Sequence, residues 1–570
     1  MNPPNAISIE DLLARCQSAR AEGRIDDAEA QCRRGLAQLP AQAGLLFENA
    51  SNAYATGGMT SARDRFRRAA VVLPGIAAIH FNVGVCERAA GRFTQAHRAF
   101  QKALLLDPSA MGALDGSSHC QVALGDSAGA FVTAARLMCI DPTSPKVLAS
   151  FGFVAWKCDR TDIALWALKK SLVLNPSGRE ADMNVANVLL RLDYRRSAIN
   201  RYRRLARLLP GDPDAWLNLG VAAITAGDWL GASDAYARLT RINRGRPGNQ
   251  ASLDPYPELP TDPTTPASRR TAWHALEFET QQLRYLLKRN ALPKEFENEL
   301  QAYQAIIQDL DEERRRAVAF DLSDTEMSSI SRYRGRLTHV AGTGWKAGAA
   351  GSDRDARPAL NPGVDWGGAE AAYVDAYPAI TVVDNFLDPM ALTALRRFCL
   401  ESTIWFELKG AGYLGAYFRD GFNDPLLLAI AEELTERMPA VFQNRPLRMI
   451  WAYTYEQTMV GINPHADFAR INVNFWITPD EANLDPETGG LLIYRRPAPE
   501  SWGFEQYNAA SGDEIMNFLG DDARAPIRVP HRQNRAVIFD SRLFHETDRL
   551  NFRPGIENRR INITMLFGEH

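Results

Sequence analysis

The sequence predicts a multidomain chain of the α + β class, with an all-helical superhelix of repeats first and an antiparallel β-sandwich or barrel last. Three observations predict this. Proline recurs every 34 residues up to residue 210, short strand-like runs follow one another from about residue 378, and a proline-rich stretch lies between the two regions. A chain of 570 residues has room for about three or four domains.

Three positions of the repeat region keep the same phase. Prolines lie 34 residues apart, at Pro40, Pro74, Pro108, Pro142, Pro176 and Pro210. Seventeen residues before them lie Gly23, Gly57, Gly91, Gly125, Asp159 and Asp193. Twelve residues before them lie Ala28, Ala62, Ala96, Ala130, Ala164 and Ala198. A seventh unit without its proline keeps Gly227 and Ala232, so the region holds about seven repeats.

Each unit is expected to form two helices. Apolar residues recur at helical spacing, as at Phe93, Ala96, Phe100 and Ala103. The glycine or aspartate is expected to end the first helix, the alanine to let two helices cross closely, and the proline to begin the next helix. Residues 7–244 resemble the tetratricopeptide repeat, which implies a right-handed superhelix with a groove for a protein or peptide partner.

Charge differs between the two halves of the chain. Residues 1–250 carry 31 Lys/Arg and 22 Asp/Glu, whereas residues 251–570 carry 34 and 46. Two domains of different pI explain this, and an acidic partner for the front half would explain it too. Either a solvated helix face or an acidic ligand would account for the arginine-rich run of Arg195, Arg196, Arg201, Arg203, Arg204 and Arg207.

Two connecting regions separate the repeats from the strands. Residues 245–269 contain six prolines and many small polar residues, which predicts an extended linker or a surface loop. Helical periodicity returns over 270–317, where Pro293 is expected to separate two helices, and residues 270–335 are predicted to form a helical spacer.

The C-terminal region, residues 370–570, is predicted to be a β-domain. Its strand-like runs are separated by turn signals, which is typical of an antiparallel sandwich or barrel. The runs are 379–387, 448–455, 470–478, 489–494, 535–540 and 561–568.

A metal-binding pattern lies within these strands. His465 and Asp467 are two residues apart beside a strand, so their side chains point the same way. His545 follows the strand 535–540 and a loop, and supplies a third ligand type. Two histidines and one carboxylate suit one face of octahedral iron(II), whereas zinc lacks a further His or Cys ligand here. Tyr455 and Arg560 lie on strands where they can reach a carboxylate cosubstrate.

The order of these residues is similar to that of the iron(II)/2-oxoglutarate-dependent dioxygenases of the prolyl-hydroxylase-like superfamily, over residues 378–568. It runs Tyr455, His465-x-Asp467, Gly489-Gly490, His545, then Arg560-x-Asn562. The resemblance implies a double-stranded β-helix, or jelly roll, with His465, Asp467 and His545 binding Fe(II). It also implies that Arg560, with Tyr455 and Asn562, holds 2-oxoglutarate, and that O2 is consumed while succinate and CO2 are released.

Several assignments stay open. Arg559 competes with Arg560 as the anchor, and Tyr453 shares a face with Tyr455. His531 competes with His545 as the distal ligand, although we interpret it as a turn residue.

The strand after Asp467 carries two asparagines, Asn472 and Asn474, on one face, which either reach the pocket or face solvent. The long connection 495–530 holds Trp502, Phe504 and Tyr507 as a lid over the site or as a surface excursion.

The hypothesis for function is hydroxylation of a protein or peptide recruited by the repeats. The alternatives are a repeat scaffold with an inactive or sensory dioxygenase fold, and a hydroxylase of a small-molecule or natural-product substrate. A nucleic-acid substrate is not expected, because the acidic catalytic region opposes phosphate binding. Seven scattered cysteines without a CxxC pair, no membrane-length apolar run and no secretory signal lead us to expect a cytoplasmic protein away from membranes.

Overall fold

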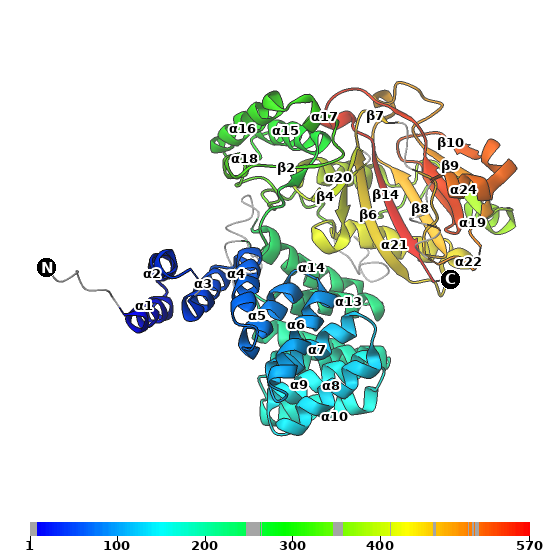
Figure 1. The fold of residues 1–570 in the computed structure, drawn as a ribbon. Helices are drawn as coiled ribbons and strands as arrows, with labels where there is room; N and C mark the ends of the chain where they lie inside the picture. Colours follow the sequence, from blue (N-terminus) through cyan, green and yellow to red (C-terminus); the bar gives the residue numbers. More distant parts are fainter. Residues whose placement is uncertain are drawn as a thin grey trace. The chain divides into compact units, whose positions relative to one another are not determined.

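The computed structural model describes residues 8–40, 42–246, 263, 265–345, 357–410, 412–459, 463–499, 501–503, 507 and 512–569. The chain divides into two compact units, Met1–Arg201 and Tyr202–His570. Figure 1 shows the helices and strands of the chain, coloured in sequence order. No helix among the described residues is both long and apolar enough to cross a membrane.

The repeat region is entirely helical, as predicted, and its described residues form seven consecutive helix pairs. The pairs in the first unit are α1 (Ile9–Ala21) and α2 (Ile25–Gln38), α3 (Ala43–Ala55) and α4 (Met59–Val72), α5 (Ala77–Ala89) and α6 (Phe93–Leu106), α7 (Met111–Ala123) and α8 (Ser127–Ile140), and α9 (Pro145–Lys157) and α10 (Thr161–Leu174). The sixth pair, α11 (Arg179–Arg191) and α12 (Arg195–Leu208), spans the boundary of the units, and α13 (Pro213–Thr225) and α14 (Trp229–Arg244) belong to the second unit.

The turn inside each pair has the left-handed conformation that the glycine lattice predicts. The φ angle is positive at Gly23, Gly57, Gly91, Gly125, Asp159, Asp193 and Gly227. Glycine adopts this conformation without a Cβ clash, and aspartate is among the few other residues that tolerate it. These positions therefore end the first helix of every pair.

The alanine of each repeat lies where two helices meet. All seven alanines, from Ala28 to Ala232, are fully buried. In the fifth pair, a Cβ placed on Gly152 of α9 would lie 3.2 Å from the carbonyl oxygen of Ala164 on α10. Such a close approach leaves no room for a larger side chain at the crossing, as the sequence predicted.

The repeat prolines lie in a different place from the one predicted. Helix α4 ends at Val72, α5 begins at Ala77, and Pro74 lies in the turn between them. Pro108 lies likewise between α6 and α7. The prediction that proline begins the next helix is wrong: the residue prevents the second helix from continuing, because it lacks the N–H that the helix would use.

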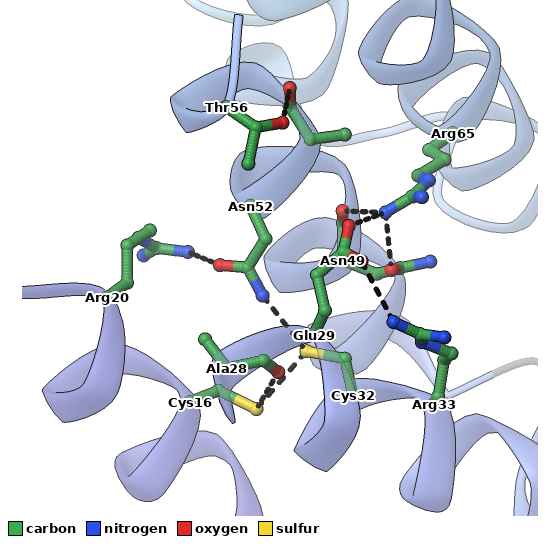
Figure 2. A network of polar contacts seen from close by, with 11 residues as sticks. Cys16, Arg20, Ala28, Glu29, Cys32, Arg33, Asn49, Asn52, Thr56 and Arg65 are labelled. Atoms are coloured by element: carbon green, nitrogen blue, oxygen red, sulfur yellow. Dashed lines mark hydrogen bonds and ion pairs between the residues drawn. The ribbon is translucent and has the colours of Figure 1, made fainter. Parts of the chain in front are cut away.

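Polar contacts join the first two repeats (Figure 2). Arg65 of α4 donates to Glu29 Oε1 of α2 at 2.7 Å and to Asn49 Oδ1 of α3 at 2.9 Å. The Cys16 and Cys32 sulfurs lie 3.1 Å apart as a thiol contact. All seven cysteines are free.

The last helix of the repeat region is attached to the β-region within the second unit. The rings of Trp229 on α14 and Phe418 on η3 (Phe418–Asp420) meet edge to face, with centroids 5.2 Å apart. Arg244 donates to both carboxylate oxygens of Asp420, at 3.2 and 2.6 Å. Helix α14 is therefore part of the body that holds the candidate site.

The predicted spacer contains five helices and two short strands. The helices are α15 (Trp273–Lys288), η2 (Lys294–Phe296), α16 (Glu297–Asp309), α17 (Glu312–Arg316) and α18 (Asp324–Ser329), and the strands are β1 (Arg270–Thr271) and β2 (Phe320–Asp321). The Gln282 amide on α15 donates to the carbonyl oxygens of Leu400 and Ser402. The spacer thus packs on the β-region. Most of the proline-rich linker 245–269 lies outside the described residues.

Two antiparallel sheets and a separate two-stranded pair, β7 (Thr458–Met459) with β13 (Leu550–Asn551), form the described β-region. The larger has the order β3 (Ile380–Val383), β11 (Ala536–Asp540), β8 (Ile471–Trp476), β14 (Ile561–Phe567), β6 (Leu447–Tyr455), β5 (Tyr413–Tyr417), β4 (Glu407–Lys409). The smaller has the order β10 (Ile527–Val529), β9 (Leu491–Pro497), β12 (Leu543–Thr547). Trp476 and Val537 from the larger sheet share one buried core with Ile493, Val529 and Leu543 from the smaller. The sheets therefore pack face to face.

Helices and short elements surround these sheets in the second unit. They are α19 (Trp366–Asp375), α20 (Pro389–Glu401), α21 (Pro425–Arg437), α22 (Pro439–Phe442), β7 (Thr458–Met459), η4 (Asp480–Ala482), α24 (Gly512–Leu519), η5 (Gly520–Arg524), β13 (Leu550–Asn551) and η6 (Ile556–Asn558). Every predicted strand-like run contains a strand, but β4, β5, β10 and β12 carried no recognised sequence signal. The connection 495–530 holds α24, η5 and β10 rather than being irregular throughout.

Candidate functional site

Three side chains from two segments that are distant in sequence meet where His465 pairs with strand β12. His465 and His545 form an isolated antiparallel bridge, with N–H to carbonyl distances of 3.0 and 2.8 Å. Their ring centroids lie 4.5 Å apart, and His545 Nε2 lies 3.6 Å from Asp467 Oδ2. The potential ligand atoms of all three residues lie within 4.8 Å of one another.

Backbone pairing explains how this cluster forms. His545 lies inside strand β12 rather than after a loop, so the expected loop 541–544 is shorter than predicted. The bridge between His545 and His465 then places the HxD segment against β12, and the Asp467 N–H donates to the Ser541 carbonyl at 3.0 Å. The two histidines and the carboxylate are thereby fixed by backbone hydrogen bonds.

Neighbouring polar groups orient each potential ligand. The Nδ1 atoms of His465 and His545 lie 3.0 Å from the carbonyl oxygens of Asn463 and Leu543, which leaves each Nε2 available. The Asn472 amide donates to Asp467 Oδ2 at 2.8 Å. Residues that bind metals regularly form hydrogen bonds of this kind to neighbouring groups, which hold the ligands in their orientation.

Burial controls the protonation of the cluster. It lowers the pKa of His545 to about 3, with a further contribution from nearby His465, so the imidazole is neutral near pH 7. Burial also raises the pKa of Asp467, against the opposing effects of His465 and the Asn472 hydrogen bond. A neutral imidazole is the form that binds a metal, and a cation beside Asp467 would favour its ionised form.

The adjacent arginines Arg559 and Arg560 point to different partners. Arg559 donates to Glu277 Oε2 at 3.1 Å and to Gln281 Oε1 at 2.9 Å, both on the spacer helix α15. Arg560 is fully buried and donates to the carbonyl oxygens of Gly489 at 2.6 Å and Gly490 at 3.2 Å. Among the described residues, Arg559 has an ion pair with a carboxylate and Arg560 has none.

Aromatic and polar groups surround the Arg560 guanidinium. The guanidinium carbon, Cζ, lies 4.7 Å from the centroid of the Tyr455 ring and 5.6 Å from the centroid of the Trp476 ring. It donates to Asn562 Oδ1 at 3.2 Å, and it also hydrogen-bonds Tyr455. Burial lowers the pKa of Arg560 but leaves it charged, because the unperturbed value is so high.

Two buried nitrogens beside Arg560 have no hydrogen-bond partner in the described structure. They are Trp476 Nε1 and His531 Nε2, whose rings lie 5.8 Å apart. Burial, with Arg560 nearby, lowers the pKa of His531 to about 3. A carboxylate group would complement this buried cation and the unsatisfied polar nitrogens beside it.

The Gly489-Gly490 pair gives Arg560 its carbonyl partners. Gly489 has a φ of +81°, and a Cβ on Gly490 would lie 1.9 Å from the carbonyl oxygen of Val529. Neither position accommodates a side chain, so the two glycines allow the close approach of β9 and β10 beside the arginine.

An open cavity of about 710 Å³ is lined in part by Asp467. Phe468, Trp502 and Tyr507 contribute aromatic walls, and Arg470 contributes a charged one. The Tyr507 carbonyl accepts from the Ala466 N–H at 3.0 Å, between the two HxD residues. Of the aromatic residues predicted to cover the site, Trp502 and Tyr507 therefore lie beside it, and Phe504 lies outside the described residues.

Sequence reasoning missed some of these roles. His531 lies outside the cluster of potential metal ligands, and its burial beside Trp476 was not foreseen when it was interpreted as a turn residue. Asn472 contacts Asp467, whereas Asn474 donates to Thr564 at 3.0 Å. Their alternation with apolar residues on a central strand was the available signal, since two buried asparagines need partners.

Family comparisons match the repeat region. One tetratricopeptide repeat family matches residues 77–110, and another matches residues 186–247. The chain therefore contains tetratricopeptide repeats. A search of curated proteins gave no match.

The chain is also similar, at low identity, to solved structures of tetratricopeptide repeat proteins. A tetratricopeptide repeat protein from Parabacteroides merdae is 12% identical, with a TM-score of 0.37, over 40% of this chain and 91% of that protein. A thermophilic TPR protein of Thermus thermophilus is 18% identical, with a TM-score of 0.27, over 32% of this chain and 100% of that one. YrrB, described as a TPR protein with an unusual peptide-binding site, is 21% identical, with a TM-score of 0.24, over 30% and 90%.

Proposed function

We propose that the protein is an iron(II)- and 2-oxoglutarate-dependent dioxygenase that hydroxylates a protein or peptide recruited by its tetratricopeptide repeats. The observation that carries the proposal is the coexistence of the His465–Asp467–His545 cluster with a buried arginine that has no ion pair among the described residues. The two face-to-face sheets are compatible with the double-stranded β-helix of such enzymes.

The ligand types and spacing fit iron(II). Adjacent ligand atoms of an octahedral ion at bond lengths near 2.1 Å lie about 3 Å apart, and the measured separations need only small side-chain movements to reach this value. Asn472 would hold the Asp467 carboxylate in its orientation. With three protein ligands on one face, the remaining positions stay available to small molecules.

The groups around Arg560 suit one carboxylate of 2-oxoglutarate. Arg560 would supply the charge, Tyr455 a hydroxyl, and Trp476 and His531 their unsatisfied nitrogens. Asn562 would keep the guanidinium in place. Because Arg560 is fully buried, its attraction for an anion would be stronger than in water.

Iron(II) with 2-oxoglutarate and dioxygen would supply the oxidation of a C–H bond, with release of succinate and CO2. The protein's part is to position the substrate. Phe468, Trp502 and Tyr507 would enclose an apolar part of a substrate side chain above Asp467, and Arg470 would contact a polar part.

The repeats support a second candidate, a protein-interaction scaffold whose β-region is inactive or sensory. The observation favouring it is the match of two segments to tetratricopeptide repeats, which usually bind proteins or peptides. A scaffold would keep its biological role after Asp467→Ala, and an enzyme would lose it. A small-molecule substrate is the remaining possibility for the same cavity.

The test is turnover of 2-oxoglutarate in the absence of a known substrate. Purified protein is incubated with iron(II), ascorbate and 2-oxoglutarate under air and under argon, and succinate is measured by mass spectrometry. We expect oxygen-dependent succinate formation that His465→Ala and His545→Ala abolish and that Arg532→Gln, a change at the surface, leaves intact. Equal succinate formation by the wild type and both histidine variants would contradict the proposal.

A further inference from the structure

Beyond catalysis, the second helices of the repeats carry a surface with its own 34-residue period. Four apolar residues occupy the equivalent position in successive repeats, 34 residues apart. They are Val71 on α4, Leu105 on α6, Cys139 on α8 and Val173 on α10. Val71 and Leu105 are each 82% exposed and Val173 is 78% exposed. Apolar side chains that stay this exposed at the same place in successive repeats mark an interaction surface rather than a core.

A basic residue accompanies each of these apolar residues. Three positions earlier, and so on the same helix face, lie Arg68, Lys102, Arg136 and Lys170. All four are exposed, and the ion pairs among the described residues include none of them. We call these eight residues the basic–apolar strip. Since repeats stack in order, equivalent positions lie side by side along the array.

Charge on the four helices that carry the strip is one-sided. Together α4, α6, α8 and α10 contain nine Lys/Arg and two Asp, and α6 and α8 contain no acidic residue. A second copy of the strip would bring like charges together in a twofold contact, so self-association through it is disfavoured. The positive electrostatic potential of the strip instead attracts an acidic partner.

The strip is hollowed between its first two helices. A hollow of about 680 Å³ is lined by Arg67 and Val71 of α4 and by Arg98, Lys102 and Leu105 of α6. Helix α5 also lines it, through His80, Val83 and Glu87, and the Glu87 carboxylate is ion-paired with Arg67 and Arg92. Packed helices approach to about 8–10 Å, and an α-helix with side chains is about 10 Å wide, so such a hollow between neighbours suits one face of a further helix. A flat lipid surface would need no hollow.

We propose that the basic–apolar strip binds an acidic amphipathic helix of another protein. The apolar face of that helix would cover Val71, Leu105, Cys139 and Val173, and its flanking Asp and Glu residues would pair with the basic row. This surface lies on the second helices of four repeats and is independent of the metal cluster, so the proposal does not depend on the enzymatic one.

The probe is a fluorescein-labelled peptide of about 18 residues made of Leu, Ala and Glu, with Leu at i, i+3, i+4 and i+7. Its binding to the full-length protein is followed by fluorescence anisotropy at low and high salt. A second peptide with Lys in place of Glu keeps the apolar face and reverses the charge. We expect the acidic peptide to bind, its affinity to fall with salt, and the basic peptide not to bind.

Two double variants test the two rows separately. Leu105→Glu with Val173→Glu places charge in the apolar row, and Lys102→Glu with Lys170→Glu reverses the basic row. We expect each to weaken peptide binding at least tenfold. Lys146→Glu, an exposed charge reversal on α9, is the matched control and should bind as the wild type does. All five positions are exposed, and circular dichroism checks that the helices remain folded.

Three results would overturn the proposal. One is peptide binding that neither double variant weakens. Another is binding of phosphatidylserine–phosphatidylcholine vesicles, lost in the double variants, without binding of the acidic peptide, because the strip would then be a membrane surface. The third is a dimer in sedimentation that the double variants dissociate.

Discussion

The repeat region and the metal cluster use their key residues in opposite ways. In the repeats, the left-handed turn and the buried alanine occur in every one of the seven helix pairs. No single one of these residues is therefore unique to the repeat region. At the candidate site, His465, Asp467 and His545 occur once and come from segments about 80 residues apart. The comparison teaches that regular structure is redundant, whereas a site depends on single side chains held by specific backbone contacts.

The largest effect is expected at the site, because nothing there replaces a lost ligand. Asp467→Ala should weaken iron(II) binding more than about 100-fold. Even residues that only hydrogen-bond a metal ligand change metal affinity by roughly 10–100-fold when they are mutated. Asn472→Ala, which removes the hydrogen bond to Asp467, should weaken it about tenfold. Iron(II) affinity is measured anaerobically by competition with a chelating dye.

The matched control for these variants is Asn474→Ala, two residues along the same strand, whose amide contacts Thr564 instead. Its iron affinity should equal that of the wild type. Equal losses in the Asn472 and Asn474 variants would show that the strand as a whole, rather than the contact to Asp467, sets the affinity.

In the repeats, one oversized side chain should cost stability and leave the site intact. Ala164→Leu adds volume where α9 and α10 cross, and overpacking of this kind costs about 2 kcal/mol of the free energy of unfolding. Ala128→Leu, at an exposed position of α8, should change it by less than about 0.5 kcal/mol. Urea unfolding followed by circular dichroism measures both, and unequal iron binding by the two variants would contradict the independence of the two regions.

The second unit should lose stability on acidification through a buried histidine on the spacer helix. Burial, with Arg559 nearby, lowers the pKa of His274 to about 4, below the unperturbed value of about 6.5. Between these values the unfolded chain binds the extra proton, so stability falls as the pH decreases, by about 2 kcal/mol from pH 7 to pH 5. His274→Gln removes the titration and should flatten the pH profile by this amount. Parallel profiles for the wild type and the variant would show that His274 does not contribute.

The smallest effect concerns the two repeats that have aspartate in the left-handed turn. Asp159→Gly should stabilise the protein by about 0.5 kcal/mol, because glycine relieves the strain at a φ of 61°, while the exposed ion pair with Arg191 contributes little. The reciprocal change Gly125→Asp should destabilise by about 1 kcal/mol. Thermal unfolding of both variants checks the sign, and a change in the same direction for the two would contradict the account.

The same contrast explains what the sequence could predict. The 34-residue period identified the helix pairs. Each turn and each helix crossing requires a particular residue type at one position, and this requirement recurs in every repeat. The proline was misplaced for a local reason: a proline between two helices fits either the end of one or the start of the next, and only the structure shows the separate turn at Pro74.

At the site, sequence order indicated the candidate residues but not their surroundings. The extended HxD geometry placed His465 and Asp467 together, whereas the strand containing His545 became evident only through its pairing with β9. The directions of Arg559 and Arg560 depend on α15 and on the glycine pair, both remote in sequence. The unsatisfied nitrogens of Trp476 and His531 depend on burial by several segments, which no local pattern reports.

The most direct test is anaerobic titration of the protein with iron(II) and 2-oxoglutarate, followed by visible absorption. The account predicts the weak charge-transfer band of iron-bound 2-oxoglutarate in the wild type and in Arg532→Gln. The band should disappear in Asp467→Ala, and Arg560→Gln should require a higher concentration of 2-oxoglutarate to produce it. Folded wild-type protein without the band, or a band unchanged by Asp467→Ala, would contradict the account.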